Sequence, residues 1–70
     1  MDIKKGDEFE LKRKIWGAAS TAAGENSRYL YPGATVKIEN PNNSWMKISS
    51  TIDGKREYFK TSKELFLKAI

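Results

Sequence analysis

The dipeptide Asp53-Gly54 constrains the fold of this chain more than any other feature. It lies between two runs that are typical of strands, Trp45–Ile52 and Lys55–Lys60. Asp-Gly supplies the two positive φ angles of a type I′ turn, whose twist matches that of paired antiparallel strands. We therefore predict a tight β-hairpin at this point. Its alternation assigns four side chains to the core: Met46, Ile48, Ile52 and Phe59.

An earlier segment, Glu8–Ile15, alternates in the same way. Its apolar residues Phe9, Leu11 and Ile15 share one face, and charged residues share the other. This period of two predicts a half-buried strand. Arg13 falls on the inward face, close to the end of the strand, where its long stem can reach solvent.

The segment Thr35–Glu39 predicts a further strand, with Val36 and Ile38 turned inward. Turn-forming residues stand on both sides of it. Pro32-Gly33 before it favours a type II turn, and Asn40–Ser44 after it is rich in residues that favour turns.

Residues 16–31 are expected to form a long surface loop. Gly17 and Gly24 bracket a stretch of small residues with no large apolar side chain for the core. Ala18–Ala23 has fair helix propensity, but a helix this short is marginal in water unless it packs on something. A loop of this length inside a compact domain is usually functional or mobile.

The C-terminal residues predict one helical turn followed by a short closing strand. Thr61-Ser62-Lys63-Glu64 fits a capping box in which Thr61 caps the helix and Glu64 reaches back to it. Because few residues remain, we expect a single 3₁₀ turn near residues 62–66. Leu65, Leu67 and Ile70 are expected to complete the core.

The composition excludes most enzyme chemistry. The chain has 70 residues, enough for one domain over residues 1–70, and contains neither cysteine nor histidine. It therefore has no nucleophile–histidine pair, no zinc site of the usual ligands and no disulfide. Asp7, Glu8 and Glu10 are close in sequence, but Glu8 and Glu10 alternate with lysines on a solvated strand face. We predict a protein with no catalytic residue, no cofactor and no metal.

The charge of the chain is moderately basic, with 13 Lys and Arg against nine Asp and Glu and a formal net charge of +4. Such a balance favours acidic partners, and it is also ordinary for the solubility of a small domain. Residues 1–7 contain no apolar run typical of a signal peptide, and no segment approaches the about 20 apolar residues of a membrane span. We expect a cytoplasmic protein without membrane contact, made by a cell or by a phage or other mobile element inside one.

The predicted order is strand, long loop, strand, turn, strand, tight hairpin, strand, helical turn and short strand. Trp45 opens the third strand after a polar turn, and Tyr58–Leu67 covers a strand, a 3₁₀ turn and a closing strand. This order resembles an SH3 domain, best over Tyr31–Ile70, with Trp45 at the position of the ligand-groove tryptophan. The resemblance implies an all-β, SH3-like five-stranded barrel and, by analogy, a binding role.

Bacterial SH3 domains are similar to this chain at three further places, Ser20-Thr21, Pro32-Gly33 and Ser44-Trp45. The family's alanine–leucine–tyrosine–aspartate signature is absent near the first strand. Thr61-Ser62 replaces the groove proline, and Glu25 alone stands for the acidic cluster that holds a ligand arginine. The resemblance therefore implies the fold and a binding role rather than polyproline recognition.

Five aromatic residues are expected at the surface: Trp16, Tyr29, Tyr31, Trp45 and Tyr58. If the 16–31 loop folds against the third strand, as in SH3 domains, these rings line one groove. Amphipathic aromatic side chains are enriched at protein-binding hot spots. The same rings are equally explained as a satellite cluster that ties down the loop. On the first interpretation the protein is an adaptor or inhibitor that binds a protein or peptide.

A second interpretation rests on cations that alternation places on the outward faces of the central strands: Lys37, Lys47, Arg56 and Lys60. Together with Trp45 and Tyr58 they would offer cations to phosphates and rings to bases. Because Glu39 and Glu57 interrupt this set in the sequence, solvated strand positions explain it slightly better. The alternative function is thus a small basic nucleic-acid-binding barrel. The sequence leaves the partner and the oligomeric state open.

Overall fold

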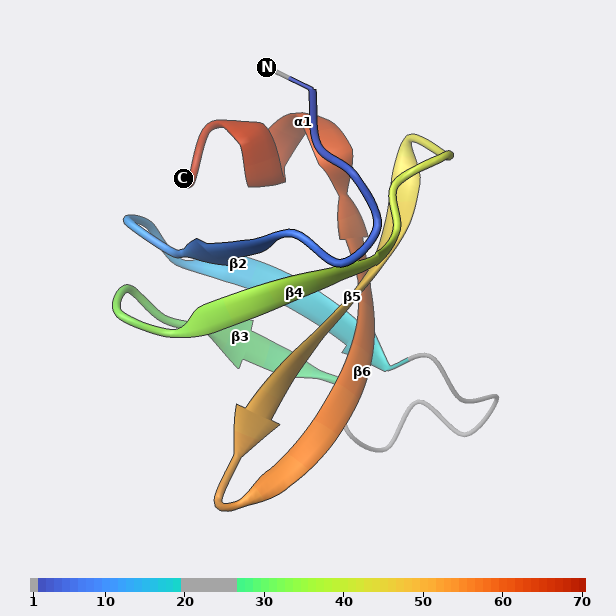
Figure 1. Ribbon diagram of the computed structural model, residues 1–70. Coiled ribbons are helices and arrows are strands. Elements are labelled where there is room, and N and C mark those ends of the chain that lie inside the picture. The colour runs from blue at the N-terminus through green and yellow to red at the C-terminus, as the bar shows by residue number, and fades with distance from the viewer. Residues whose placement is uncertain (1, 20–26) are drawn as a thin grey trace.

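The structure is a computed structural model that describes residues 2–19 and 27–70, within which the chain forms six strands and one short helix (Figure 1). The elements are β1 (Glu8–Glu10), β2 (Ile15–Ala19), β3 (Arg28–Leu30), β4 (Thr35–Asn40), β5 (Trp45–Ile52), β6 (Lys55–Ser62) and α1 (Lys63–Leu67). The strands pair antiparallel in the order β1-β4-β5-β6-β2-β3. The predicted all-β class is confirmed, with six strands in place of the five expected.

The β5–β6 hairpin confirms the first prediction. Asp53 and Gly54 have φ angles of 52° and 81°, the two positive values that a type I′ turn requires. Pairing runs without interruption from Ile52 opposite Lys55 to Trp45 opposite Ser62. Because the side chains of directly opposite residues lie on the same face of a sheet, this register fixes which residues of both strands point outward.

Strand β4 and the turn before it also form as predicted. The Ala34 N–H donates a hydrogen bond to the Tyr31 carbonyl at 3.1 Å, and Gly33 has a φ of 96°, as the third residue of a type II turn requires. Val36 and Ile38 of β4 are fully buried.

The predicted strand Glu8–Ile15 is divided in two. Its first part, β1, pairs with β4, whereas Ile15 begins β2, which pairs with β3 and β6. Between them the Leu11 N–H donates to the Ala34 carbonyl at 2.9 Å, and the Lys12 N–H donates to the Ala69 carbonyl. The segment leaves the strand conformation because it carries the chain from one side of the sheet to the other. Leu11 and Ile15 are buried as predicted, but Arg13 is exposed rather than inward.

The predicted loop over residues 16–31 is wrong at both of its ends, where β2 and β3 pair with each other. One of its small residues, Gly17, has a packing role. Gly17 is buried in β2, and a Cβ added there would lie 3.0 Å from the Phe59 ring. A side chain larger than hydrogen would fit here only if the Phe59 ring moved by a few tenths of an ångström. The remainder of the predicted loop, residues 20–26, lies outside the described residues.

One apolar core lies inside the curled sheet, under α1. Its fully buried side chains come from three strands, β4, β5 and β6, from the helix and from the segment between β1 and β2. They include Leu11, Val36, Ile38, Ile48, Phe59 and Phe66. The Phe9 ring packs edge-on against Phe66, with ring centroids 6.0 Å apart, which joins β1 to the helix.

Helix α1 begins one residue later than predicted. Ser62, not Thr61, is the N-cap, and its Oγ accepts a hydrogen bond from the Leu65 N–H at 3.3 Å. Thr61 is instead a buried residue of β6, opposite Met46. The turn is α-helical rather than 3₁₀, and the predicted closing strand is not formed. Within the described part of the chain, no helix is long and apolar enough to cross a membrane.

The sheet curls so that β2 and β3 lie behind β4 (Figure 1). In the described residues its edges are β1 and β3. The tip of the β5–β6 hairpin extends beyond the neighbouring strands. In the described residues, β5 pairs with β4 only as far as Ser50, and β6 pairs with β2 only as far as Phe59. The hairpin tip and edge strand β3 therefore border an opening in the curled sheet.

Candidate binding surfaces

Trp16 and Tyr29 form an aromatic pair on the outer face of the sheet. They lie directly opposite each other on β2 and β3, and their ring centroids are 5.0 Å apart at an interplanar angle of 70°. The Lys14 ammonium lies over the Tyr29 ring, 4.4 Å from its centroid. Trp16 is 44% exposed and Tyr29 is 45% exposed. The two rings therefore contact each other while a large part of each side chain remains open to solvent.

A pocket of about 400 Å³ lies beside this pair. Leu65 of α1 contributes a third large apolar side chain, which is 57% exposed. Arg13, Lys14 and Lys68 also line the pocket. We call Trp16, Tyr29 and Leu65 the apolar patch. Leu65 was predicted to be a core residue of a short closing strand, but it lies in α1, whose buried residue is Phe66.

The other three residues of the predicted groove, Tyr31, Trp45 and Tyr58, do not line this pocket. Trp45 lies opposite Ser62, and Tyr58 lies opposite Ser49 further along the outer face of the hairpin. Tyr31 follows β3 and lines a different cavity. Of the five aromatic residues, the structure thus brings Trp16 and Tyr29 into direct contact.

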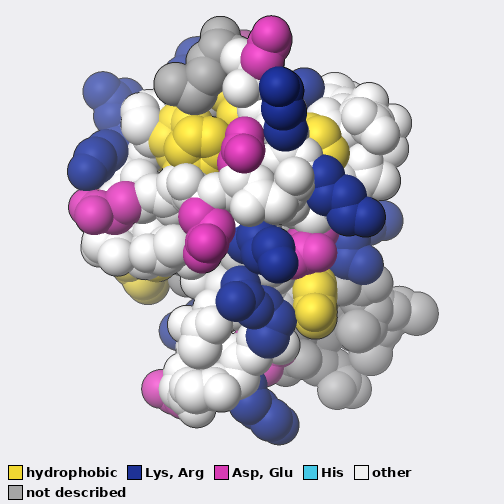
Figure 2. Space-filling view, in the orientation of Figure 1, with side chains coloured by type: hydrophobic (Ala, Val, Ile, Leu, Met, Phe, Trp, Pro, Cys, Tyr) yellow, Lys and Arg dark blue, Asp and Glu magenta, His cyan; other side chains and the backbone are white. Residues whose placement is uncertain are grey.

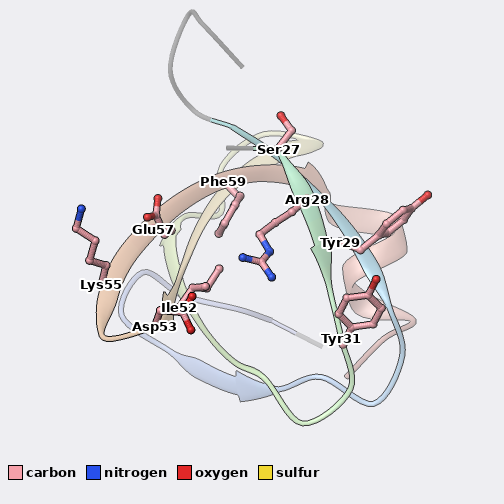
Figure 3. A pocket seen from close by; sticks show the side chains of 9 residues that line it. All are labelled: Ser27, Arg28, Tyr29, Tyr31, Ile52, Asp53, Lys55, Glu57 and Phe59. Atoms are coloured by element: carbon pink, nitrogen blue, oxygen red, sulfur yellow. The ribbon is translucent and has the colours of Figure 1, made fainter. Parts of the chain in front are cut away.

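The cavity beside Tyr31 occupies the opening between β3 and the hairpin tip and has a volume of about 450 Å³. Figure 3 shows Arg28 reaching from β3 into this cleft toward Ile52. Asp53 and Glu57 line it as well, so its charges are mixed. Sequence reasoning placed Arg28 in a loop and gave it no role; its inward direction follows from its register opposite Gly17.

The four predicted cations, Lys37, Lys47, Arg56 and Lys60, all lie on the outer face of β4, β5 and β6. Lys47 is directly opposite Lys60, and Arg56 is opposite Thr51. Lys37 is opposite Ser49 on one side and Glu8 on the other. Figure 2 shows one face of the molecule, on which Lys and Arg side chains gather near the centre with Asp and Glu side chains among them.

The carboxylates considered for catalysis have other contacts. Asp7 accepts a hydrogen bond from the Lys4 N–H at 2.9 Å, and Glu10 forms an exposed ion pair with Lys12 at 3.1 Å. Glu8 is exposed on β1. Among residues 2–19 and 27–70, no three acidic side chains gather into a group that would hold a metal ion.

Comparison with protein-family models, curated proteins and solved structures finds no match to this chain. The candidate surfaces therefore rest on their own geometry.

Proposed function

We propose that this domain is a non-enzymatic protein-interaction module that binds a short segment of a partner protein at the apolar patch. The observation that carries the proposal is the exposure of Trp16, Tyr29 and Leu65 around one pocket of about 400 Å³. Large apolar side chains gathered at a concave surface are typical of binding sites, and aromatic residues contribute most to interface energy.

The charge around the patch indicates the chemistry of the partner. Arg13, Lys14 and Lys68 line the pocket. Lys68 forms an ion pair with Glu64 at 3.6 Å, but both side chains are exposed, and such a pair contributes little in water. A segment that inserts a large apolar side chain and carries acidic residues beside it would complement this surface.

We also propose that the curled sheet is a partly open variant of the SH3-like barrel. Support comes from the order of elements in the second half of the chain, where a tight hairpin leads through β6 into one helical turn. The proposal places the partner on the outer face of β2 and β3 beside α1.

Selection from a random peptide library on the immobilised domain tests the function. We expect enrichment of peptides with an aromatic or leucine side chain flanked by Asp or Glu. Synthetic versions of the enriched peptides should change the fluorescence of Trp16, and their affinity should fall about tenfold or more in Tyr29→Ala and Leu65→Ser.

Tyr58→Ala is the matched control, because Tyr58 is as exposed as Tyr29 but does not line the pocket. Peptide binding should be retained in this variant. Enriched peptides that bind Tyr29→Ala and Leu65→Ser as well as the unmodified domain would remove the apolar patch as the binding site.

A further inference from the structure

The outer face of β6 presents cations and an aromatic ring in alternation. Lys60, Tyr58 and Arg56 are two residues apart along the strand, and the register puts all three on the outward side. Successive outward side chains of a strand are about 7 Å apart, so Lys60 and Arg56 are about 14 Å apart. Lys47 of β5 extends this row sideways, because it lies directly opposite Lys60. We call these four residues the β6 face.

Within the described residues, no ion pair includes a cation of the β6 face. Like charges directly opposite each other on neighbouring strands are destabilising, and Lys47 and Lys60 are such a pair. The ion pairs in the described residues are Lys12–Glu10 and Lys68–Glu64, and neither includes a residue of the β6 face. The Lys47 ammonium is instead 5.3 Å from the centroid of the Tyr58 ring.

Of the two acids that interrupt this set in the sequence, Glu57 points away from the β6 face, whereas Glu39 shares the Ser49 hydroxyl with Arg56. Glu57 is opposite Ser50 and lines the cleft on the inner side of the sheet. The Glu39 carboxylate accepts a hydrogen bond from the Ser49 Oγ at 2.6 Å. The same Oγ accepts a hydrogen bond from the Arg56 guanidinium at 3.3 Å. Glu39 therefore acts through Ser49 to position Arg56 at one end of the face.

A ring flanked by cations suits a ligand that alternates flat bases with phosphates. Tyr58 is 45% exposed, which leaves ring surface for a base to stack on. A base inside a duplex is already stacked on both sides, so the ring selects an unpaired strand. The distance of about 14 Å between Lys60 and Arg56 matches the length of about four stacked nucleotides. This number is at the lower end of the site size of small nucleic-acid-binding barrels.

We infer that the β6 face binds single-stranded nucleic acid, with Tyr58 stacking on a base and Lys47, Arg56 and Lys60 contacting phosphates. This site is separate from the apolar patch and does not depend on the proposed protein partner. Oligothymidylate and oligouridylate are both expected to bind, because stacking and phosphate contacts do not read the 2′-hydroxyl.

Fluorescence anisotropy of labelled oligothymidylate and oligouridylate of about 12 nucleotides tests the inference. With three phosphate contacts, the logarithm of the affinity should fall with the logarithm of salt concentration with a slope of about −2, measured from about 50 to about 200 mM. Lys47→Gln and Lys60→Gln should each make this slope shallower by about 0.7. Lys5→Gln removes the same charge from another exposed position and should leave the slope unchanged.

Tyr58→Ala and Tyr29→Ala separate stacking from general attraction, since both tyrosines are 45% exposed. Tyr58→Ala should weaken oligothymidylate binding about tenfold, and Tyr58→Phe should restore it. Tyr29→Ala should not change oligothymidylate binding, even though the same substitution is expected to weaken peptide binding about tenfold or more. Equal affinity for polyglutamate and oligothymidylate, equal loss in both alanine variants, or no binding at low salt would each overturn the inference.

Discussion

The backbone of Gly17 lies against the Phe59 ring so closely that an added Cβ would be 3.0 Å from two ring carbons. Gly17→Ala should therefore destabilise the domain by about 1–3 kcal/mol, because the buried ring cannot move aside without repacking the core. Urea denaturation followed by tryptophan fluorescence measures the change. Ala18→Thr, on the other face of the same strand, is the control and should shift stability by no more than about 0.5 kcal/mol.

Gly54 in the hairpin turn should be almost as sensitive, for a different reason. Its φ of 81° is a conformation that side chains with a Cβ adopt only at a cost. No atom other than those of its chain neighbours lies within 4 Å of the position of an added Cβ, so sterics with the rest of the protein contribute nothing. Gly54→Ala should lower the free energy of unfolding by about 1–2 kcal/mol. Asp53→Asn should be neutral or slightly stabilising, since Asn-Gly also favours type I′ turns. If Asp53→Asn lowered the free energy of unfolding as much as Gly54→Ala, the assigned turn would be contradicted.

Phe66 and Leu65 are neighbours in α1 with opposite expected sensitivities. Phe66 is fully buried, and Phe66→Ala should lower the free energy of unfolding by about 3–5 kcal/mol. This loss is a large fraction of the total stability of a small domain. Leu65 is largely exposed, so Leu65→Ala should cost about 0.5 kcal/mol or less. Circular dichroism during thermal melting compares the two variants. The reverse order of stability would contradict the assignment of Phe66, rather than Leu65, to the core.

The parts of the fold that sequence analysis predicted correctly are those set by local chemistry. The turn at Asp53-Gly54 requires two positive φ angles, and Val36 and Ile38 of β4 alternate with outward residues. Both signals can be read without knowing what the strands contact. Strand β2 could not be found in this way. The position of residue 17 favours glycine because the Phe59 ring, from a distant part of the chain, packs against it. In a sequence read alone, small residues are more often typical of a loop.

The candidate site was predicted less well than the fold because it depends on pairing and on helix phase. Trp16 and Tyr29 meet only because β2 and β3 are strands in a particular register. Leu65 was assigned to the core on a closing strand, but residues 63–67 form α1, which buries Phe66 and exposes Leu65. In a helix, one residue corresponds to a rotation of about 100°, which is enough to exchange a buried position for an exposed one.

The opposition of Lys47 and Lys60 gives a last prediction that separates stability from binding. Lys60→Glu replaces a like-charge pair on neighbouring strands by an opposite-charge pair, so it should raise the free energy of unfolding by about 0.2–1 kcal/mol at low salt. The gain should shrink as salt screens the exposed charges. If the β6 face binds nucleic acid, the same variant should lose oligothymidylate binding, because it places a carboxylate where a phosphate would lie. Denaturation and anisotropy on one preparation measure both effects. If the variant is more stable and binds equally well, the like-charge pair has no role in binding. If it is more stable but no longer binds, the chain keeps two opposed lysines at a cost in stability because a ligand needs them.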